Sequence, residues 1–422
     1  MIKTIAIGQG GGPTSVINSS LAGALYEAKA RKLKVYGLVN GIEALLDPPR
    51  KVMDIGDWDE KRIRTIPGAI LGTTRRKISL ENEGDKEKIE IMKKNISALG
   101  IDAFVYFGGN DSAYVLQALE GTTRIVHGAK TVDNDLMESH HTPGFGSAAS
   151  YNIRAVKSLA ADFFSYAING TGEIKVAPVA IYQTMGRDTG WLALSTAFAR
   201  FNEKGYDSNL SPDIVWIPEI EFNKDFFLSR LGNVLSRKGK AVVVVSEGVW
   251  QNEGIVKKPI AQFCKREGLC KDEHGHEDFG RSYAGSAAEY LAELVRNELK
   301  VDNVKMIKDV LINPQHLQRC YERGHNDAIE AFEVGRETVN AIMDDETGIS
   351  IVLQKGYGER YNISPRRVPL ELIAGKTRYV PPEFYDSING PTMEFVKEFL
   401  PVVGGMGRLP IYYEPARKYV VG

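Results

Sequence analysis

The sequence lacks the features that would mark a membrane, secreted or nucleic-acid-binding protein. It has no run of about 18 apolar residues, the length at which a transmembrane helix is considered. Its formal net charge is only −1, so no overall charge attracts nucleic acid or an anionic membrane. Three cysteines among 422 residues are too few for a disulfide framework and indicate a reducing compartment. Because the first residues also lack the apolar run of a signal peptide, we expect a cytoplasmic protein without nucleic-acid or membrane partners.

Two of the cysteines lie close to two histidines, which raises the question of a zinc site. Cys264, Cys270, His274 and His276 follow the spacing C-x5-C-x3-H-x-H, which matches no common structural zinc pattern. The sequence therefore favours a solvated loop over a metal site in this segment.

What the sequence does contain is an alternation of short apolar strands with amphipathic helices. Continuous apolar runs of this kind are typical of strands buried on both faces of a parallel sheet. Repeated βαβ units predict a doubly wound α/β architecture, in which ligands bind at the carboxyl ends of the strands. The strands are expected at 4–9, 34–39, 103–109, 176–183, 213–218 and 241–248, with helices at 16–32 and 86–99.

Glycine-rich turns follow the first predicted strand and recur later. The turn Gly10-Gly11-Gly12-Pro13-Thr14 precedes a helix, where free N–H groups and the helix dipole favour an anion. It is not a dinucleotide fingerprint, because Ser15 stands where the last glycine should be, and the chain contains no P-loop. A second loop, GAILGTTRRK (68–77), adds cations suited to phosphoryl oxygens, although an exposed basic turn would have the same composition.

Carboxylates follow the next two strands. GGNDS (108–112) comes directly after one of them, and KTVDND (130–135) carries Asp133 and Asp135 two residues apart, so both side chains project the same way. One carboxylate can take a proton from a hydroxyl while the other holds Mg²⁺, and phosphoryl transfer needs little more. A turn capped by Asp and Asn is the alternative for both segments.

Three further polar segments lie at the ends of later elements. MGRDTGW (185–191) follows a predicted strand, Glu247 ends another, and Gln318-Arg319 follows DVLINPQHL. Each of them, taken alone, is typical of an ordinary polar turn.

Taken together and in this order, these segments resemble the phosphofructokinase family. The resemblance runs from about Lys3 to Arg319, roughly three quarters of the chain. Any one motif is weak, but eight in the right order are specific. They are GGGPTSVIN, GAILGTTR, GGNDS, KTVDND, TPGFGSAA, MGRDTG, SEG and QR.

The resemblance implies a role for each matching position. Asp133 is implied as the catalytic base, and Arg75, with Lys130 and Asp111, as the other catalytic groups. Mg²⁺ is the implied cofactor, with Asn110 and Asp135 at its site. The phosphoryl donor would be bound by Gly11, Gly12, Arg75, Gly109, Asp111 and Lys130, and the sugar phosphate by Thr131, Asp133, Met185, Gly186, Arg187, Glu247 and Arg319.

Two positions indicate which donor is used. Members that use ATP resemble GGDGS with glycine before Thr-Ile-Asp, whereas members that use pyrophosphate resemble GGDDS and PKTIDND. This chain has Asp111 and Lys130, the pyrophosphate pattern at both positions. A carboxylate at 111 would repel the α-phosphate of ATP, and the ammonium of Lys130 would bind a pyrophosphate that brings no adenosine.

The resemblance thus implies a pyrophosphate:fructose 6-phosphate 1-phosphotransferase, which forms fructose 1,6-bisphosphate reversibly. It also implies two doubly wound, Rossmann-like parallel-sheet domains and a homodimer or homotetramer. The donor domain would comprise residues 1–150 and roughly 317–345, and the sugar-phosphate domain 151–316 and roughly 346–422.

Departures from the family pattern leave alternatives open. Asn110 stands where the family usually has a metal-associated aspartate, and His316 and the residues after Arg319 fit poorly. The alternatives are another acceptor such as sedoheptulose 7-phosphate, ATP as the donor, or a regulatory subunit without catalysis. The intact Asp133, Asp135 and Arg187 argue against the last of these.

Overall fold

The computed structural model describes most of the chain, with gaps between the described ranges. These ranges are 2–46, 51–76, 78, 82–165, 179–202, 205–206, 210–263, 286–299, 307–312, 314–358, 361–386 and 390–404. None of the helices in them is long and apolar enough to cross a membrane. The cysteines and histidines of the C-x5-C-x3-H-x-H segment lie outside the described residues.

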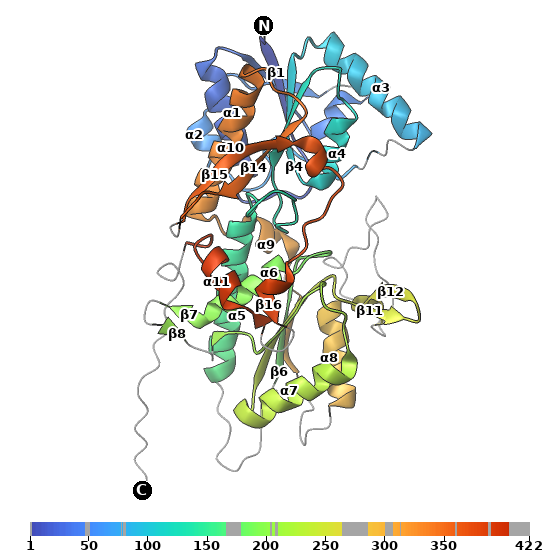
Figure 1. Cartoon of the computed structure of the whole chain (residues 1–422), viewed down its shortest axis with the longest axis vertical. Helices are drawn as coiled ribbons and strands as arrows, with labels where there is room; N and C mark the ends of the chain where they lie inside the picture. The colour runs from blue at the N-terminus through green and yellow to red at the C-terminus, as the bar shows by residue number, and fades with distance from the viewer. Residues whose placement is uncertain are drawn as a thin grey trace.

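The chain forms two lobes stacked along the long axis of the molecule (Figure 1). The first lobe contains a seven-stranded sheet whose inner strands are parallel and whose two edge strands are antiparallel to their neighbours. Its strands are, in spatial order, β15 (Ile363–Pro369), β14 (Ile349–Lys355), β5 (Arg124–Ala129), β4 (Ala103–Gly108), β1 (Thr4–Gln9), β2 (Lys34–Leu38) and β3 (Val52–Asp54).

Helices cover both faces of this sheet because its central strands are apolar on both sides. Ile5 and Ile7 of β1 pack on one face against α1 (Ile17–Ala30) and α10 (His325–Met343). Ala6 points to the other face, where α3 (Glu83–Ala98) and α4 (Asn110–Gln117) lie. The alternation along a single strand gives the sheet two separate apolar cores.

The second lobe has a four-stranded, fully parallel sheet with the order β13 (Ile307–Ile312), β6 (Val179–Thr184), β10 (Ala241–Ser246) and β9 (Ile214–Trp216). Helices again pack on both faces. On one face lie α5 (Phe145–Ser165), α6 (Trp191–Ser195) and α11 (Met393–Phe399). On the other lie α7 (Lys224–Lys238) and α8 (Ala287–Glu298).

Shorter elements complete the lobes, and α9 (Gln315–Cys320) lies between the two sheets (Figure 1). The others are η1 (Gly41–Leu45), α2 (Glu60–Ile63), η2 (Thr196–Arg200), β7 (Phe201–Asn202), β8 (Gly205–Tyr206), β11 (Trp250–Glu253), β12 (Val256–Pro259), η4 (Ile260–Phe263), η5 (Leu370–Leu372), η6 (Pro382–Phe384), β16 (Tyr385–Asp386) and β17 (Gly390–Pro391).

The predicted fold of two doubly wound parallel-sheet domains is confirmed. The assignment of residues 346–422 to the second domain is wrong for β14 and β15, because β14 pairs with β5 and extends the first sheet. The helix expected at 86–99 begins earlier, at Glu83, because the side chain of Asn82 accepts the N–H of Gly84 and caps it. The ligands that each domain binds remain a prediction.

Helices α1 and α10 cross at unusually close range. A Cβ added at Gly335 would lie 1.9 Å from the carbonyl oxygen of Ser20, and one at Gly23 would lie 2.0 Å from that of Phe332. Only glycine permits this approach, so the two backbones touch where the helices cross.

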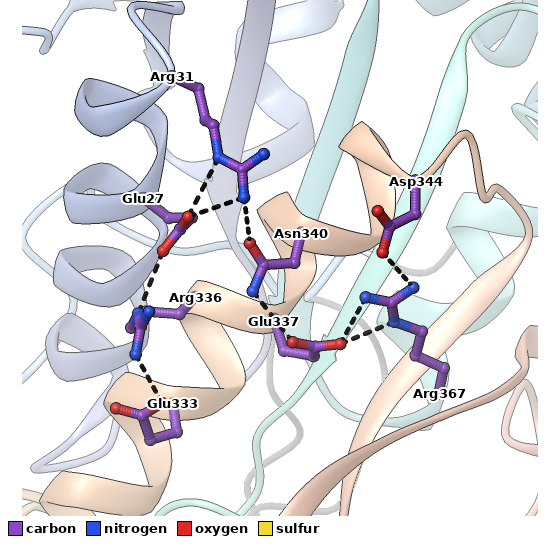
Figure 2. A network of polar contacts seen from close by, with 8 residues as sticks. All are labelled: Glu27, Arg31, Glu333, Arg336, Glu337, Asn340, Asp344 and Arg367. Carbon is purple, nitrogen blue, oxygen red and sulfur yellow. Dashed lines mark hydrogen bonds and ion pairs between the residues drawn. The ribbon is translucent and has the colours of Figure 1, made fainter.

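Polar contacts on the outer side of this crossing fix its direction (Figure 2). Glu27 of α1 accepts hydrogen bonds from Arg31 on its own helix, at 3.1 Å, and from Arg336 on α10, at 3.2 Å. Arg367 of β15 forms an ion pair at 2.7 Å with Glu337 of α10. The three arginines are partly exposed, whereas the side chain of Glu27 is only 9% exposed. Because each pair still reaches solvent through its arginine, it contributes about 0–1 kcal/mol and mainly orients α10 on the sheet.

We predict that Gly335→Ala destabilises the protein by about 2 kcal/mol, because the added methyl group forces the helices apart. Gly232→Ala is the matched control, since Gly232 lies in α7 with open space around its Cα and alanine favours a helix. Thermal unfolding should show a lower midpoint for the first variant and an equal or higher one for the second. Equal midpoints for Gly335→Ala and the parent chain would contradict the close crossing.

Candidate active site

A cleft of about 340 Å³ lies where the carboxyl ends of strands from both sheets meet. Its lining includes backbone from the glycine turns and charged side chains of both signs. The lining residues are Gly11, Gly12, Thr74, Arg75, Arg76, Tyr106, Gly109, Asn110, Asp111, Ser112, Val115, Lys130, Thr131, Val132, Asp133, Asp135, Met185, Arg187, Asp188, Thr189, Glu247, Gln315, Arg319 and Thr377.

The glycine turn after β1 forms one wall of the cleft. Gly11 has a left-handed φ of +73°, and its N–H donates to the carbonyl of Thr74 at 2.9 Å, which holds the loop of Arg75 beside it. The hydroxyl of Thr14 accepts the N–H of Ile17 at 2.9 Å and caps the start of α1. This local chemistry leaves the backbone of Gly11 and Gly12 exposed toward the cleft.

Lys130 lies directly against this turn. Its Nζ donates to the carbonyl of Gly12 at 2.7 Å, and a Cβ on Gly11 would come within 3.2 Å of the same atom. The side chain is only 2% exposed, and this burial, together with the nearby Arg319 and Arg75, lowers the pKa of Lys130 to about 7. A buried cation in this position is stabilised when an anion binds beside it.

Two carboxylates follow Lys130 on the same extended segment. Asp133 has its N–H bonded to the hydroxyl of Thr131 at 3.1 Å, and its buried Oδ1 has no hydrogen-bond partner. Burial raises the pKa of Asp133, although Arg319 and Arg187 oppose the shift. Burial and the neighbouring Asp133 together raise the pKa of Asp135 to about 7.

The start of α4 brings Asn110 and Asp111 to the cleft. The Oδ1 of Asn110 accepts the N–H of Asp111 at 2.7 Å, and its Nδ2 donates to the carbonyl of Lys376 at 3.1 Å. Asp111 therefore lies in the first turn of α4 and lines the cleft together with Gly109 and Lys130.

The second lobe supplies the opposite wall. The N–H of Gly186 donates to Glu247 at 3.3 Å, and the hydroxyl of Thr189 donates to the carbonyl of Asp133 at 3.1 Å. The pKa of Glu247 is raised to about 7, mainly by burial and to a lesser extent by the negative charge of Asp133. Met185 is fixed by its N–H, which donates to Gln318 at 2.9 Å.

Arg319 of α9 lies between the two walls. A Cβ on Gly12 would be 3.1 Å from its Nε, while its Nη1 donates to Gln315 at 2.8 Å. Asp133 and Glu247 are the acidic groups whose charges act most strongly on it. Arg319, the residue predicted to reach the sugar's 6-phosphate, therefore lies beside the turn of Gly11 and Gly12.

The cleft brings together every predicted site residue except Gly186, which lies behind it and contacts Glu247. Asp111, Lys130 and Asp133, on which the donor hypothesis depends, all face the same space. Their individual roles stay predictions.

Sequence reasoning did not find Tyr106, Val115, Gln315 or Thr377, although all four line the cleft. Tyr106 and Val115 belong to apolar runs that are typical of a buried core. Gln315 precedes the QR motif and is not part of any motif that indicates a function. Thr377 comes from the carboxyl-terminal part of the chain, where no strand end or glycine turn signals a site.

A model of the phosphofructokinase family matches residues 4–342, most of the chain. The chain belongs to the phosphofructokinase family. The predicted family is thereby confirmed.

Two relatives and one solved structure show how near this phosphofructokinase is to known members. It is 31% identical, over 95% of its length and 94% of the relative's, to a pyrophosphate--fructose 6-phosphate 1-phosphotransferase of Rhodospirillum rubrum. It is 29% identical, over 90% of its length and 91% of the relative's, to a sulfofructose kinase of Alkalicoccus urumqiensis. The structure of a pyrophosphate-dependent phosphofructokinase from Nitrosospira multiformis has a TM-score of 0.76 at 24% identity, over 99% of this chain and 96% of that one, and shows the same fold.

We predict an alkaline limb in the pH dependence of kcat/KM for the phosphoryl donor. The pKa of Lys130 is lowered, so its ammonium is lost as the pH rises through about 7 in the free enzyme. Lys130→Gln should have a lower kcat/KM and no such limb. Lys94→Gln, at an exposed position on α3, is the control and should keep the parent profile. An alkaline limb that persists unchanged in Lys130→Gln would assign it to another group.

Proposed function

We propose that this phosphofructokinase transfers a phosphoryl group from inorganic pyrophosphate to the 1-hydroxyl of fructose 6-phosphate, reversibly and with Mg²⁺. The observation that carries the proposal is the buried ammonium of Lys130, fixed at the carbonyl of Gly12 in the same cleft as Asp111. The names of curated relatives such as the Rhodospirillum rubrum enzyme support the same donor and acceptor.

The pyrophosphate would lie between the turn of Gly11 and Gly12 and the cations Arg75 and Lys130. Backbone N–H groups and these cations would neutralise its oxygens, which a small donor without adenosine requires. If ATP placed its β- and γ-phosphates where pyrophosphate binds, its α-phosphate would lie at Asp111. The carboxylate of Asp111 would repel that phosphate.

Asp133 would take the proton from the acceptor hydroxyl. Its Oδ1 is buried without a hydrogen-bond partner and its pKa is raised, as a base in a largely dry site requires. The hydroxyl of Thr131 accepts the N–H of Asp133, and the hydroxyl of Thr189 donates to its carbonyl. These two bonds fix the backbone of Asp133 before substrate binds. The second-lobe residues Arg187 and Glu247 would bind the sugar.

The residues present fit Mg²⁺. This ion is commonly held by one or two carboxylates together with substrate phosphates. Asp135 would hold it, next to the unpartnered oxygen of Asp133. The Oδ1 of Asn110 already accepts the N–H of Asp111, so Asn110 would contribute through its remaining lone pair or a water. When bound, Mg²⁺ would supply charge neutralisation on the transferred group.

A second acceptor is favoured by one structural observation and one relative. Arg319, the residue predicted to reach a 6-phosphate, lies against Gly12 of the turn that would bind the donor. One of the relatives is named a sulfofructose kinase, and this name indicates a fructose with a sulfonate group as the acceptor of that enzyme. Fructose 6-phosphate, sedoheptulose 7-phosphate and a 6-sulfonated fructose, each assayed with pyrophosphate, distinguish these acceptors by kcat/KM.

We predict that Asp133→Asn reduces kcat by about 10²–10⁴-fold, the contribution of a positioned general base, while folding stays intact. Asp57→Asn changes an exposed aspartate in the same way and should leave kcat unchanged. Initial rates and thermal unfolding of the purified variants measure both effects. More than about a tenth of the parent activity in Asp133→Asn would contradict the assignment of the base.

We predict that Asp111→Gly combined with Lys130→Gly lowers kcat/KM for pyrophosphate and raises it for ATP. The double change removes the carboxylate that repels the α-phosphate and the ammonium that compensates for the missing adenosine. Donor preference, measured as the ratio of the two kcat/KM values, should fall by more than about tenfold. A ratio that does not move would show that other groups exclude the nucleotide.

A further inference from the structure

A segment from the carboxyl-terminal part of the chain crosses the cleft between the two lobes. Residues 375–380, here called the strap, follow η5 and carry Thr377 into the lining of the cleft. The N–H of Gly375 donates to the carbonyl of Asn110 at 3.4 Å, and the side chain of Asn110 donates to the carbonyl of Lys376 at 3.1 Å. The strap is therefore bonded to the start of α4.

Two residues further on, the same strap is bonded to the backbone of the segment that carries the second carboxylate of the site. The N–H of Arg378 donates to the carbonyl of Asp135 at 2.8 Å, and its Nη1 donates to the carbonyl of Asn134 at 3.4 Å. The charge of Asp135 acts on the guanidinium of Arg378 and opposes the effect of its burial, which lowers the pKa of Arg378. Asn110 and Asp135, the two groups that would hold the metal, are thus tied to positions of the strap that are two residues apart.

The guanidinium of Arg378 is itself fixed in place. It stacks over the ring of Trp191 at 4.2 Å, and the indole N–H of Trp191 donates back to the carbonyl of Arg378 at 3.2 Å. Such stacking requires a planar cation, which lysine cannot supply. Trp191 begins α6, so the contact also joins the strap to the second lobe.

The far end of the strap is bonded to that lobe by a carboxylate. Oε1 of Glu219 accepts the N–H of Val380 at 2.9 Å and the N–H of Gly190 at 3.1 Å. The strap is consequently held at Asn110, at Asp135 and at the start of α6, and a segment held at three such points has little freedom to shift.

We propose that the strap is part of the active site and that Arg378 is a positioning residue. It keeps Asp135 at a fixed position relative to Asn110, so that both can bind the metal–pyrophosphate complex. This inference rests on the proposed function. It assigns a role to a part of the chain in which sequence reasoning found no chemistry.

Three roles for Arg378 give different outcomes in one binding measurement. A positioning residue improves the binding of Mg²⁺ with pyrophosphate, because partners behind the ligands orient them. A cation that acts only by repulsion weakens the binding of Mg²⁺, so its removal would strengthen it. A residue that only joins the lobes would change stability and leave binding unchanged.

The experiment is equilibrium dialysis of radiolabelled pyrophosphate against the full-length protein, without a sugar, over a series of free Mg²⁺ concentrations. In Arg378→Met, which removes the charge and keeps an apolar chain over Trp191, the Mg²⁺ concentration for half-maximal retention should rise about 10–100-fold. Arg366→Met changes an exposed arginine on β15 and should leave it unchanged. Arg378→Lys, which keeps the charge but loses the stacking, should give an intermediate rise.

An unchanged or lower Mg²⁺ requirement in Arg378→Met overturns the positioning role. If Arg378→Met does not fold, Arg378→Lys carries the test, and an unchanged requirement in that variant overturns the role equally. Pyrophosphate that the parent protein does not retain at any Mg²⁺ concentration would instead contradict the proposed function, and the inference with it. Retention by the parent with no effect of either variant would contradict the inference alone.

Discussion

The contact between the ammonium of Lys130 and the carbonyl of Gly12 is the interaction on which the rest of the site depends. It keeps a cation buried at the mouth of a glycine turn, at a cost in desolvation that a bound anion offsets. The fold makes this contact by placing the ends of β1 and β5 on the same edge of one sheet. Lys130 lies one residue past β5, so the two aspartates that follow it necessarily enter the same cleft.

Both lobes contribute charged side chains to the cleft, and these side chains act on one another even when no substrate is bound. Arg187 of the second lobe opposes the raised pKa of Asp133, and the charge of Asp133 in turn raises the pKa of Glu247. Arg319 of α9 acts on the pKa of Asp133, Glu247 and Lys130. Such mutual dependence means that a change at one charged position alters the protonation of the others. The strap, bonded to Asn110 of the first lobe and to Glu219 of the second, joins the two parts of the chain that carry these groups.

Sequence reasoning reached the fold and most of the candidate site, because both depend on local patterns. Apolar runs predicted strands such as β4, and each glycine turn or carboxylate that follows a strand end was found by its position in the chain. It could not place β14 and β15 in the first sheet, since pairing with β5 is a contact across more than two hundred residues that leaves no local pattern. Thr377 and Arg378 were missed for the same reason: the bonds of their segment to Asn110 and Asp135 form only after the chain has folded back over the cleft.

The cleft is proposed to accept pyrophosphate and to exclude a nucleotide. Initial rates of the purified protein with fructose 6-phosphate, at equal free Mg²⁺, should therefore be compared with pyrophosphate and with ATP as the donor. We expect pyrophosphate to support transfer with the higher kcat/KM and ATP to support little or none. Transfer from ATP at least as efficient as from pyrophosphate would contradict the proposed donor.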